Sequence, residues 1–378
     1  MNTFRFWPVG QGLFYTGSIM NGDFNFVYDC GSNDDNYINK CIDAYLDTII
    51  PSSTIDFVVI SHMHYDHFSG LWRLADKAKI KKLYLPYLGN DKNIITLILA
   101  NAVFGEAANG ARENLYRIYN FMLHLYNVES ETNNEFPNIE TVFINDDYTI
   151  HKDNDSFYSL LTSHKVNNYW KFSLIAKQIS TTTYATLNAQ ISALLKVEKV
   201  SCILDLVNTD TGVNKVINIY NTVFKKKQNP TSIILVHQPL NNLQTFFTET
   251  NLFDKDYFYC NASFFYNKIC PQNICNLTTR RNITLLTGDA CFDKNIISIV
   301  TNELNNNTAF ITQVPHHGAK TEWYRFEKGK FNTLQYVIPY GLGNTYRHPN
   351  KETVDEILSK GSKLISVTQN EGYIYWID

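Results

Sequence analysis

The chain has 378 residues, which is enough for one large α/β domain or for two domains of ordinary size. Hydrophobic residues make up 44% of it and charged residues 18%, which is the composition of a globular protein with its own core. The formal net charge of −3 excludes the strong positive field that attracts nucleic acid non-specifically, although a local basic groove stays compatible with it.

Neither the first twenty residues nor the cysteines indicate secretion. The start lacks the pattern of a signal peptide, and no later stretch is long and apolar enough to span a membrane. The seven cysteines are an odd number without CxxC pairing, which favours reduced thiols over a disulfide framework. Cys260, Cys270 and Cys275 could join a structural zinc, but they lack the paired spacing of a zinc knuckle. We therefore expect a cytoplasmic protein without a membrane partner, and the sequence carries no signal of its oligomeric state.

The first ninety residues alternate short strand patterns with glycine turns and helices. Strands are predicted at 3–7, 13–19, 24–28, 56–60 and 82–85. Helices are predicted at 37–49, where Pro51 ends the pattern, and at 70–77. This β-loop-α-β order is typical of layered α/β folds.

The middle of the chain has a different pattern. Apolar residues recur at helical spacing between 93 and 126, and the segment 156–195 has mixed character. Strand patterns return at 232–236, 283–286, 309–313 and 336–338. With no repeat or low-complexity linker, we expect a single domain over 1–378 with an inserted, largely helical subdomain at about 90–228.

The segment 61–70, SHMHYDHFSG, carries the clearest chemical signal. His62, His64, Asp66 and His67 lie within six positions, directly after the buried strand predicted at 56–60. Imidazole and carboxylate groups are ligands that zinc, manganese and iron accept. In an extended loop, His62 and His64 can turn to one metal while Asp66 and His67 turn to another. A chance patch of exposed histidines is the alternative, and the ordered spacing after a strand argues against it.

Further ligands are expected just beyond other strands. Asp289 follows a strand and a glycine, His316 and His317 with Lys320 follow the strand that ends near Val314, and His348 precedes Pro349. Taken alone, each has an ordinary interpretation as a solvated turn residue or a structural histidine. Beside the cluster at 62–67, the ligand interpretation is favoured.

These motifs together resemble a known family. The HxHxDH pattern at 62–67 is the signature of the metallo-β-lactamase superfamily, and the flanking motifs resemble the branch with the ComEC hydrolase domain and the phosphorylcholine esterases. The family's VGQG, Asp-x-Gly, LLTGD, HHGSKTS and YGHP motifs are matched at 9–12, 29–31, 285–289, 316–321 and 346–349. The resemblance implies the αββα four-layer sandwich of the metallo-β-lactamase fold.

It also implies roles for single residues. His62 and His64 would bind a first metal, Asp66, His67 and His348 a second, and Asp289 would bridge both. Asp29 would orient the loop histidines, and His317 or His316 would meet the phosphate or the leaving group.

The chain departs from the superfamily at one place. Superfamily members commonly supply another first-metal histidine where this chain has Asn229. The ComEC-like branch also has asparagine at this place. Water or His237 could complete that site.

The function expected from this is that of a metal-dependent hydrolase, and first of all a phosphodiesterase or nuclease acting on nucleic acid or a nucleotide. Two divalent ions would activate a hydroxide that attacks phosphorus, with zinc as the first expectation and manganese as the second. Asp66 would orient it, and His317 or Lys320 would stabilise the phosphoryl oxygens. The alternatives are hydrolysis of a carboxylic ester, thioester or lactam, and a catalytically silent binding protein.

Overall fold

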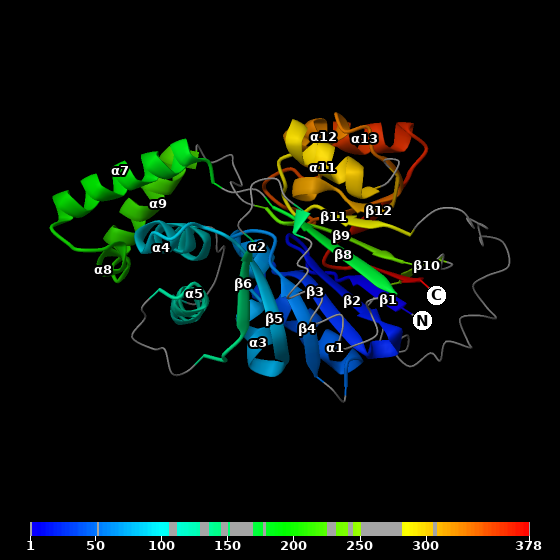
Figure 1. Cartoon of the computed structure of the whole chain (residues 1–378), viewed down its shortest axis with the longest axis horizontal. Helices are drawn as coiled ribbons and strands as arrows, with labels where there is room; N and C mark the ends of the chain where they lie inside the picture. The colour runs from blue at the N-terminus through cyan, green and yellow to red at the C-terminus, as the bar shows by residue number, and fades with distance from the viewer. Residues whose placement is uncertain are drawn as a thin grey trace.

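The computed structural model describes residues 2–50, 53–105, 112–128, 136–144, 150–151, 169–176, 179–224, 232–240, 245–250, 282–304 and 308–377. Two sheets lie face to face, and helices cover the outer face of each (Figure 1). The predicted four-layer αββα sandwich of the metallo-β-lactamase fold is confirmed.

The first sheet has eight strands in the order β10-β15-β1-β2-β3-β4-β5-β6. Strands β3 to β6 run parallel to one another, whereas β1, β2, β10 and β15 pair antiparallel. The strands are β1 Asn2–Phe6, β2 Phe14–Ile19, β3 Phe24–Cys30, β4 Thr54–Val59, β5 Lys79–Pro86, β6 Glu140–Ile144, β10 Thr245–Thr250 and β15 Gly372–Ile377.

The second sheet has seven strands in the order β14-β13-β12-β11-β9-β8-β7. Strands β11 to β14 are parallel, and β9 joins them antiparallel to β11. The strands are β7 Ile150–His151, β8 Trp170–Ile175, β9 Ile234–Pro239, β11 Thr284–Leu286, β12 Thr308–Gln313, β13 Asn332–Pro339 and β14 Lys363–Val367.

Aromatic side chains fill the space between the sheets. Alternate residues of β1 and β3 point inward, so that Phe4, Phe24 and Phe26 are fully buried there. Phe26 packs on Phe57 of β4 with ring centroids 5.2 Å apart, and on Phe172 of β8 at 5.0 Å. The high aromatic content of the sequence thus serves this core.

Helices α1 Asp35–Thr48 and α3 Leu71–Lys77 cover the first sheet, while α11 Lys294–Leu304, α12 Lys320–Glu327 and α13 Lys351–Ser359 cover the second (Figure 1). Short helical turns η1 Met20–Gly22, α2 Tyr65–Phe68 and η5 Pro315–Gly318 lie between strands and helices. The last two carry candidate site residues.

The remaining helices gather at one end of the sandwich, at the left in Figure 1. They are α4 Lys92–Ala100, η2 Asn101–Gly105, α5 Arg112–Leu125, α7 Thr181–Glu198, α8 Ile203–Val207 and α9 Asp210–Phe224. The range 90–228 also contains β6, the edge strand of the first sheet, and β7 and β8 of the second sheet. Its helices therefore form two stretches, one before and one after these strands. None of the described helices has the length and apolar character needed to cross a membrane.

Candidate metal centre

The candidate site residues lie in loops that follow the carboxyl ends of parallel strands. The loop after β4 runs through His62 and His64 into α2, which carries Asp66 and His67. Asp289 follows β11 in the second sheet. β4 belongs to the first sheet and β11 to the second, so the two loops meet across the edge of the sandwich although they are far apart in sequence.

The loop that carries Asp289 is held rigidly by one buried side chain. Oε1 of Gln313 accepts hydrogen bonds from the backbone nitrogens of Thr287 at 2.8 Å and of Gly288 at 2.7 Å. Gly288 has φ of +51°, and a Cβ atom there would lie 2.7 Å from Oγ of Ser61. Glycine therefore allows the Asp289 loop to approach the histidine loop closely.

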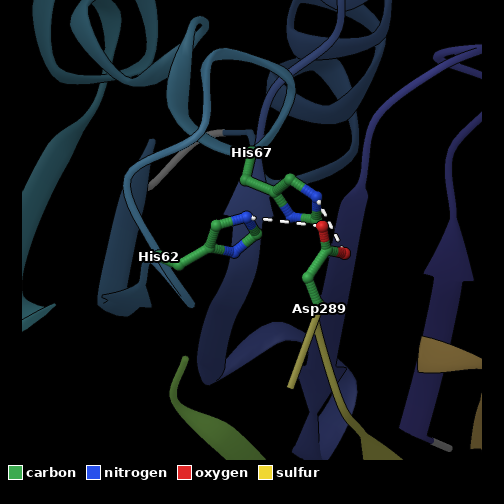
Figure 2. Close-up of side chains that lie close together, drawn as sticks. All are labelled: His62, His67 and Asp289. Carbon is green, nitrogen blue, oxygen red and sulfur yellow. Dashed lines mark ion pairs between the residues drawn. The ribbon is translucent and has the colours of Figure 1, made fainter. Parts of the chain in front are cut away.

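The two carboxylate oxygens of Asp289 face different histidines. Oδ2 lies 3.5 Å from Nε2 of His62 and 3.9 Å from Nδ1 of His64. Oδ1 lies 3.4 Å from Nε2 of His67 and 4.0 Å from Nε2 of His317. Figure 2 shows the rings of His62 and His67 turned toward the carboxylate of Asp289, which lies on the opposite loop. In a tetrahedral zinc site with bonds of about 2.0–2.1 Å, neighbouring ligand atoms are about 3.4 Å apart, so this spacing suits a metal.

Two sets of three residues have ligand atoms close enough together to hold a metal ion. One consists of His62, His67 and Asp289, and the other of Asp66, His67 and His317. In the second set, Nε2 of His317 lies 3.3 Å from Oδ2 of Asp66, and Nε2 of His67 lies 3.8 Å from Oδ1. The geometry thus brings His317 to the place where the family resemblance implied His348.

Several polar atoms at this centre are buried without a hydrogen-bond partner in the described part of the chain. They are Nε2 of His62, His67 and His317, and Oδ1 of Asp289. Burying such atoms unsatisfied costs about 1–3 kcal/mol each. Divalent cations would satisfy these atoms, since imidazole nitrogen and carboxylate oxygen are their usual ligands. The residues present therefore fit a metal centre.

Asp29 and Ser61 fix the orientation of two histidines. Nδ1 of His67 donates to Oδ2 of Asp29 at 2.8 Å, and the Ser61 hydroxyl donates to the same oxygen at 2.7 Å. Since that hydroxyl proton is used, Nδ1 of His62, 2.9 Å from the Ser61 oxygen, donates to it. Both imidazoles then carry a proton on Nδ1. Nε2 of His62 is left unprotonated, because burial lowers the pKa of this ring, and Nε2 of His67 is the atom at which a metal would replace the second proton that the carboxylates favour. Sequence reasoning anticipated Asp29, but nothing in the pattern pointed to Ser61 or Gln313.

His317 is fixed in the same way. Its Nδ1 donates to the backbone oxygen of Pro339 at 2.8 Å, at the end of β13. The side chain is 2% exposed, so this hydrogen bond is protected from water. Its Nε2 also stays available to a metal.

Burial and charge shift the pKa values of the centre in opposite directions. Burial lowers the pKa of His62 well below its ordinary value and that of His64 to about 4. Burial also opposes protonation of His67, but the carboxylates of Asp289 and Asp66 outweigh it and raise its pKa. The pKa of Asp289 lies well below its usual range, because the surrounding imidazoles outweigh the effect of burial. The carboxylates are therefore ionised and attract a cation.

Two predicted site residues lie further out. Lys320 is 60% exposed and its ammonium lies 2.5 Å from the Glu352 carboxylate. His348 is half-buried, with its ring centroid 5.6 Å from that of His316 and 6.1 Å from that of Tyr346. Within the described chain, the nitrogens of His348 form no ion pair with a carboxylate.

Of the two residues considered for completing the first metal site, Asn229 and His237, the structure describes His237. Asn229 lies outside the described residues, as do the three cysteines considered for a structural zinc. His237 lies in the core between the sheets, where Nδ1 accepts a hydrogen bond from Trp170 at 3.2 Å and Nε2 lies 2.8 Å from the Tyr15 hydroxyl. Both ring nitrogens are engaged there, so His237 has none left for a metal.

Comparisons with known proteins agree with this architecture. Residues 15–91 match the family model described as metallo-beta-lactamase superfamily. Members of that superfamily are metal-dependent hydrolases. No curated protein sequence matches the chain.

Three solved structures that resemble it are the metallo-beta-lactamase fold protein YhfI from Bacillus subtilis, the metal-dependent hydrolase Tm1679, and unliganded yeast PDE1. Their identities are 9%, 11% and 8%, and their TM-scores 0.42, 0.41 and 0.40. Each comparison covers 98% or more of both chains.

Proposed function

We propose that this protein is a metal-dependent phosphodiesterase that acts on nucleic acid or a nucleotide through a centre of two divalent ions. The observation that carries the proposal is the carboxylate of Asp289, each oxygen of which faces its own set of imidazole nitrogens. A carboxylate in that position can bridge two cations.

Within this proposal, His62 and His64 with Asp289 would hold one ion, and Asp66, His67 and His317 with Asp289 would hold the other. When bound, two cations lower the pKa of a shared water and stabilise the charge on the attacking and leaving oxygens of an in-line displacement. Zinc is the first expectation for these ligands and manganese the second.

The exposed fractions indicate the side from which a substrate approaches. The side chains of His62 and His67 are fully buried and Asp289 is 3% exposed, whereas His64 is 22% and His316 30% exposed. We therefore place the phosphodiester above His64 and His316, with the Asp66 side beneath it shielded from bulk water. Exclusion of water strengthens the electrostatic interactions with the phosphoryl oxygens.

Two residues near this opening are candidate contacts for the rest of the substrate. Lys320 begins α12 directly after η5, and a phosphoryl oxygen would compete with Glu352 for its ammonium. Burial lowers the pKa of His348 to about 4, so that its ring is neutral at neutral pH and can accept a hydrogen bond from the substrate.

A substrate panel tests the function. We would load the protein with zinc or manganese and measure hydrolysis of bis-p-nitrophenyl phosphate, single-stranded DNA and a chromogenic lactam. We expect cleavage of the phosphodiesters, and its loss in Asp289→Asn. Asp355→Asn is the matched control, because Asp355 makes only an exposed ion pair with Lys351.

Other results of this panel would support a different function. Cleavage of the lactam alone would replace the phosphodiesterase with a carbonyl hydrolase. Fewer than one equivalent of bound metal with no turnover would favour a binding protein. Full phosphodiesterase activity in metal-loaded Asp289→Asn would overturn the bridging role.

A further inference from the structure

We propose that His316 is the third imidazole ligand of the first metal, so that the adjacent pair His316 and His317 serves both ions, one residue each. This inference rests on the binuclear centre of the proposed function. It does not depend on which substrate that centre hydrolyses.

The distances around Oδ2 of Asp289 carry the proposal. Nδ1 of His316 lies 3.8 Å from this oxygen, beside Nε2 of His62 at 3.5 Å and Nδ1 of His64 at 3.9 Å. Three imidazole nitrogens thus lie 3.5–3.9 Å from one carboxylate oxygen, against ~3.4 Å between neighbouring ligands of a tetrahedral site. The two closer-packed ligand sets contain His67 and not His64 or His316, so an ion at Oδ2 would have to draw these two rings inward. Three histidines and one aspartate are a complete ligand set for zinc.

Neighbouring side chains normally cannot serve two metals unless the backbone turns sharply between them. His316 has φ and ψ of 50° and 52°, and His317 of 51° and 24°, so both are left-handed. The two rings lie 6.3 Å apart and nearly perpendicular, at 88°. Left-handed backbone costs about 1–2 kcal/mol per residue outside glycine, and such strain concentrates at functional sites.

The same turn is anchored to the loop of Asp289. The backbone nitrogen of His316 donates to the backbone oxygen of Gly288 at 3.1 Å, and Nε2 of Gln313 donates to that oxygen at 3.1 Å as well. The position of the His316 ring relative to the neighbouring Asp289 carboxylate is therefore fixed by main-chain contacts. This is the rigidity that a metal ligand requires.

No other described imidazole is placed to take this role. His237 uses both nitrogens in the core. His348 packs on the ring of His316 at 5.6 Å, and among the described residues its nitrogens form no ion pair with Asp289, whereas Nδ1 of His316 does.

The competing explanation is that His316 is a proton donor. Its Nδ1 also lies 3.9 Å from Oε2 of Glu322, a buried carboxylate on α12. A protonated imidazole between Glu322 and Asp289 could donate to the leaving oxygen. The ligand and donor roles predict different metal contents.

Metal binding distinguishes them. We would titrate the metal-free protein with Co²⁺, following the visible absorption and the bound metal after dialysis, in wild type and in His316→Ala, His317→Ala and His348→Ala. We expect His316→Ala to weaken one of two sites by more than about 100-fold, beyond what loss of an outer partner costs. His317→Ala should weaken the other site, and His348→Ala should keep both.

A rescue variant guards against a folding defect. His316→Asp places a carboxylate oxygen the same number of bonds from the backbone as Nδ1, and aspartate tolerates left-handed backbone. We expect it to restore the first site, with an altered Co²⁺ spectrum, where His316→Ala does not.

Two cobalt ions bound by His316→Ala with wild-type affinity and spectrum would overturn the assignment. If activity were then lost for alkyl esters but kept for nitrophenyl esters, His316 would be the proton donor instead. Because these measurements concern binding, a protein that fails to cleave phosphodiesters still tests them.

Discussion

Nδ1 of His67 lies 2.8 Å from Oδ2 of Asp29, and the two side chains are completely buried. A carboxylate can only accept, so this contact holds the proton of the imidazole on Nδ1 and leaves Nε2 for a metal. Asp29 itself has φ of +56°, a left-handed conformation that aspartate and asparagine tolerate better than most residues.

We predict that Asp29→Asn lowers metal affinity without unfolding the protein. Asparagine can keep the backbone conformation and accept from the nitrogen of Ser61 at the Oδ1 position, 2.6 Å away. Its amide then faces Nδ1 of His67 and favours the tautomer with the proton on Nε2. Loss of an orienting partner costs about 10–100-fold in affinity, which competition with a chelator would measure. Unchanged affinity in a folded variant would contradict the role of Asp29.

Removal of metal should lower thermal stability. A metal held by the folded centre, whose buried Nε2 and Oδ1 atoms otherwise lack partners in the described chain, would favour the folded state. At a free metal concentration about 1,000 times Kd, the gain is about 4 kcal/mol. We expect a lower melting temperature in EDTA, recovery with zinc, and a much smaller response in Asp289→Asn. Identical melting curves with and without metal would argue against the site.

Several residues singled out in the sequence lie together in the fold, namely His62, Asp66, His67, Asp289 and His317. Runs such as DFVVI end in candidate ligands, and a buried strand followed by a polar loop places such residues at a sheet edge wherever the sheet lies. Ser61 and Gln313 could not be found in this way. Their roles depend on contacts with Asp29 and with the loop after β11, which only the folded chain brings together.

Strand β15 shows a different kind of omission. Tyr373, Tyr375 and Ile377 alternate and point into the core, each with 0% exposure. All five residues at 373–377 are apolar or aromatic, so the sequence shows an apolar run but not which residues point inward. The partners of β15 were not visible either, since β1 and β10 come from distant segments. The range 90–228 was interpreted as an inserted subdomain because helical patterns dominate it, and its short contributions to the sheets, β6 in the first and β7 and β8 in the second, carry no comparable signal in the sequence.

The buried His237 should make stability depend on pH. Burial lowers its pKa to about 3, from an ordinary 6.5. The unfolded chain therefore binds a proton below pH 6.5 that the folded chain refuses until about pH 3, so stability falls as the pH is lowered through this window. At about 1.4 kcal/mol per pH unit, His237 contributes a loss of about 2 kcal/mol between pH 7 and 5.

His237→Phe tests this dependence, because phenylalanine does not titrate. The variant leaves the indole of Trp170 without its acceptor and should be less stable at pH 7. Its denaturant-derived free energy of unfolding should then fall less steeply with acid, so that the two curves approach each other by about 2 kcal/mol at pH 5. Other titrating groups affect both proteins alike. Parallel curves would show that His237 is protonated in the folded state.

Gly31 couples the end of β3 to the metal loop through close packing. A Cβ atom at this position would lie 2.5 Å from backbone atoms of both Asp66 and His67. Backbone cannot move aside as a flexible side chain can, so Gly31→Ala must displace α2, which carries Asp66 and His67. We expect it to destabilise the protein by about 3 kcal/mol, the upper range for overpacking, and to weaken metal binding.

Gly361→Ala is the matched control for that prediction. Gly361 has φ of +72° and nothing within 4 Å of an added Cβ atom, so alanine there meets backbone strain alone. We expect a loss of about 1 kcal/mol in chemical denaturation with unchanged metal affinity. If Gly31→Ala had the same effect as Gly361→Ala on both stability and metal affinity, the packing of Gly31 against Asp66 and His67 would not determine the positions of these two side chains. A specific loss of metal affinity in Gly31→Ala would instead show that this contact sets the distance across the centre.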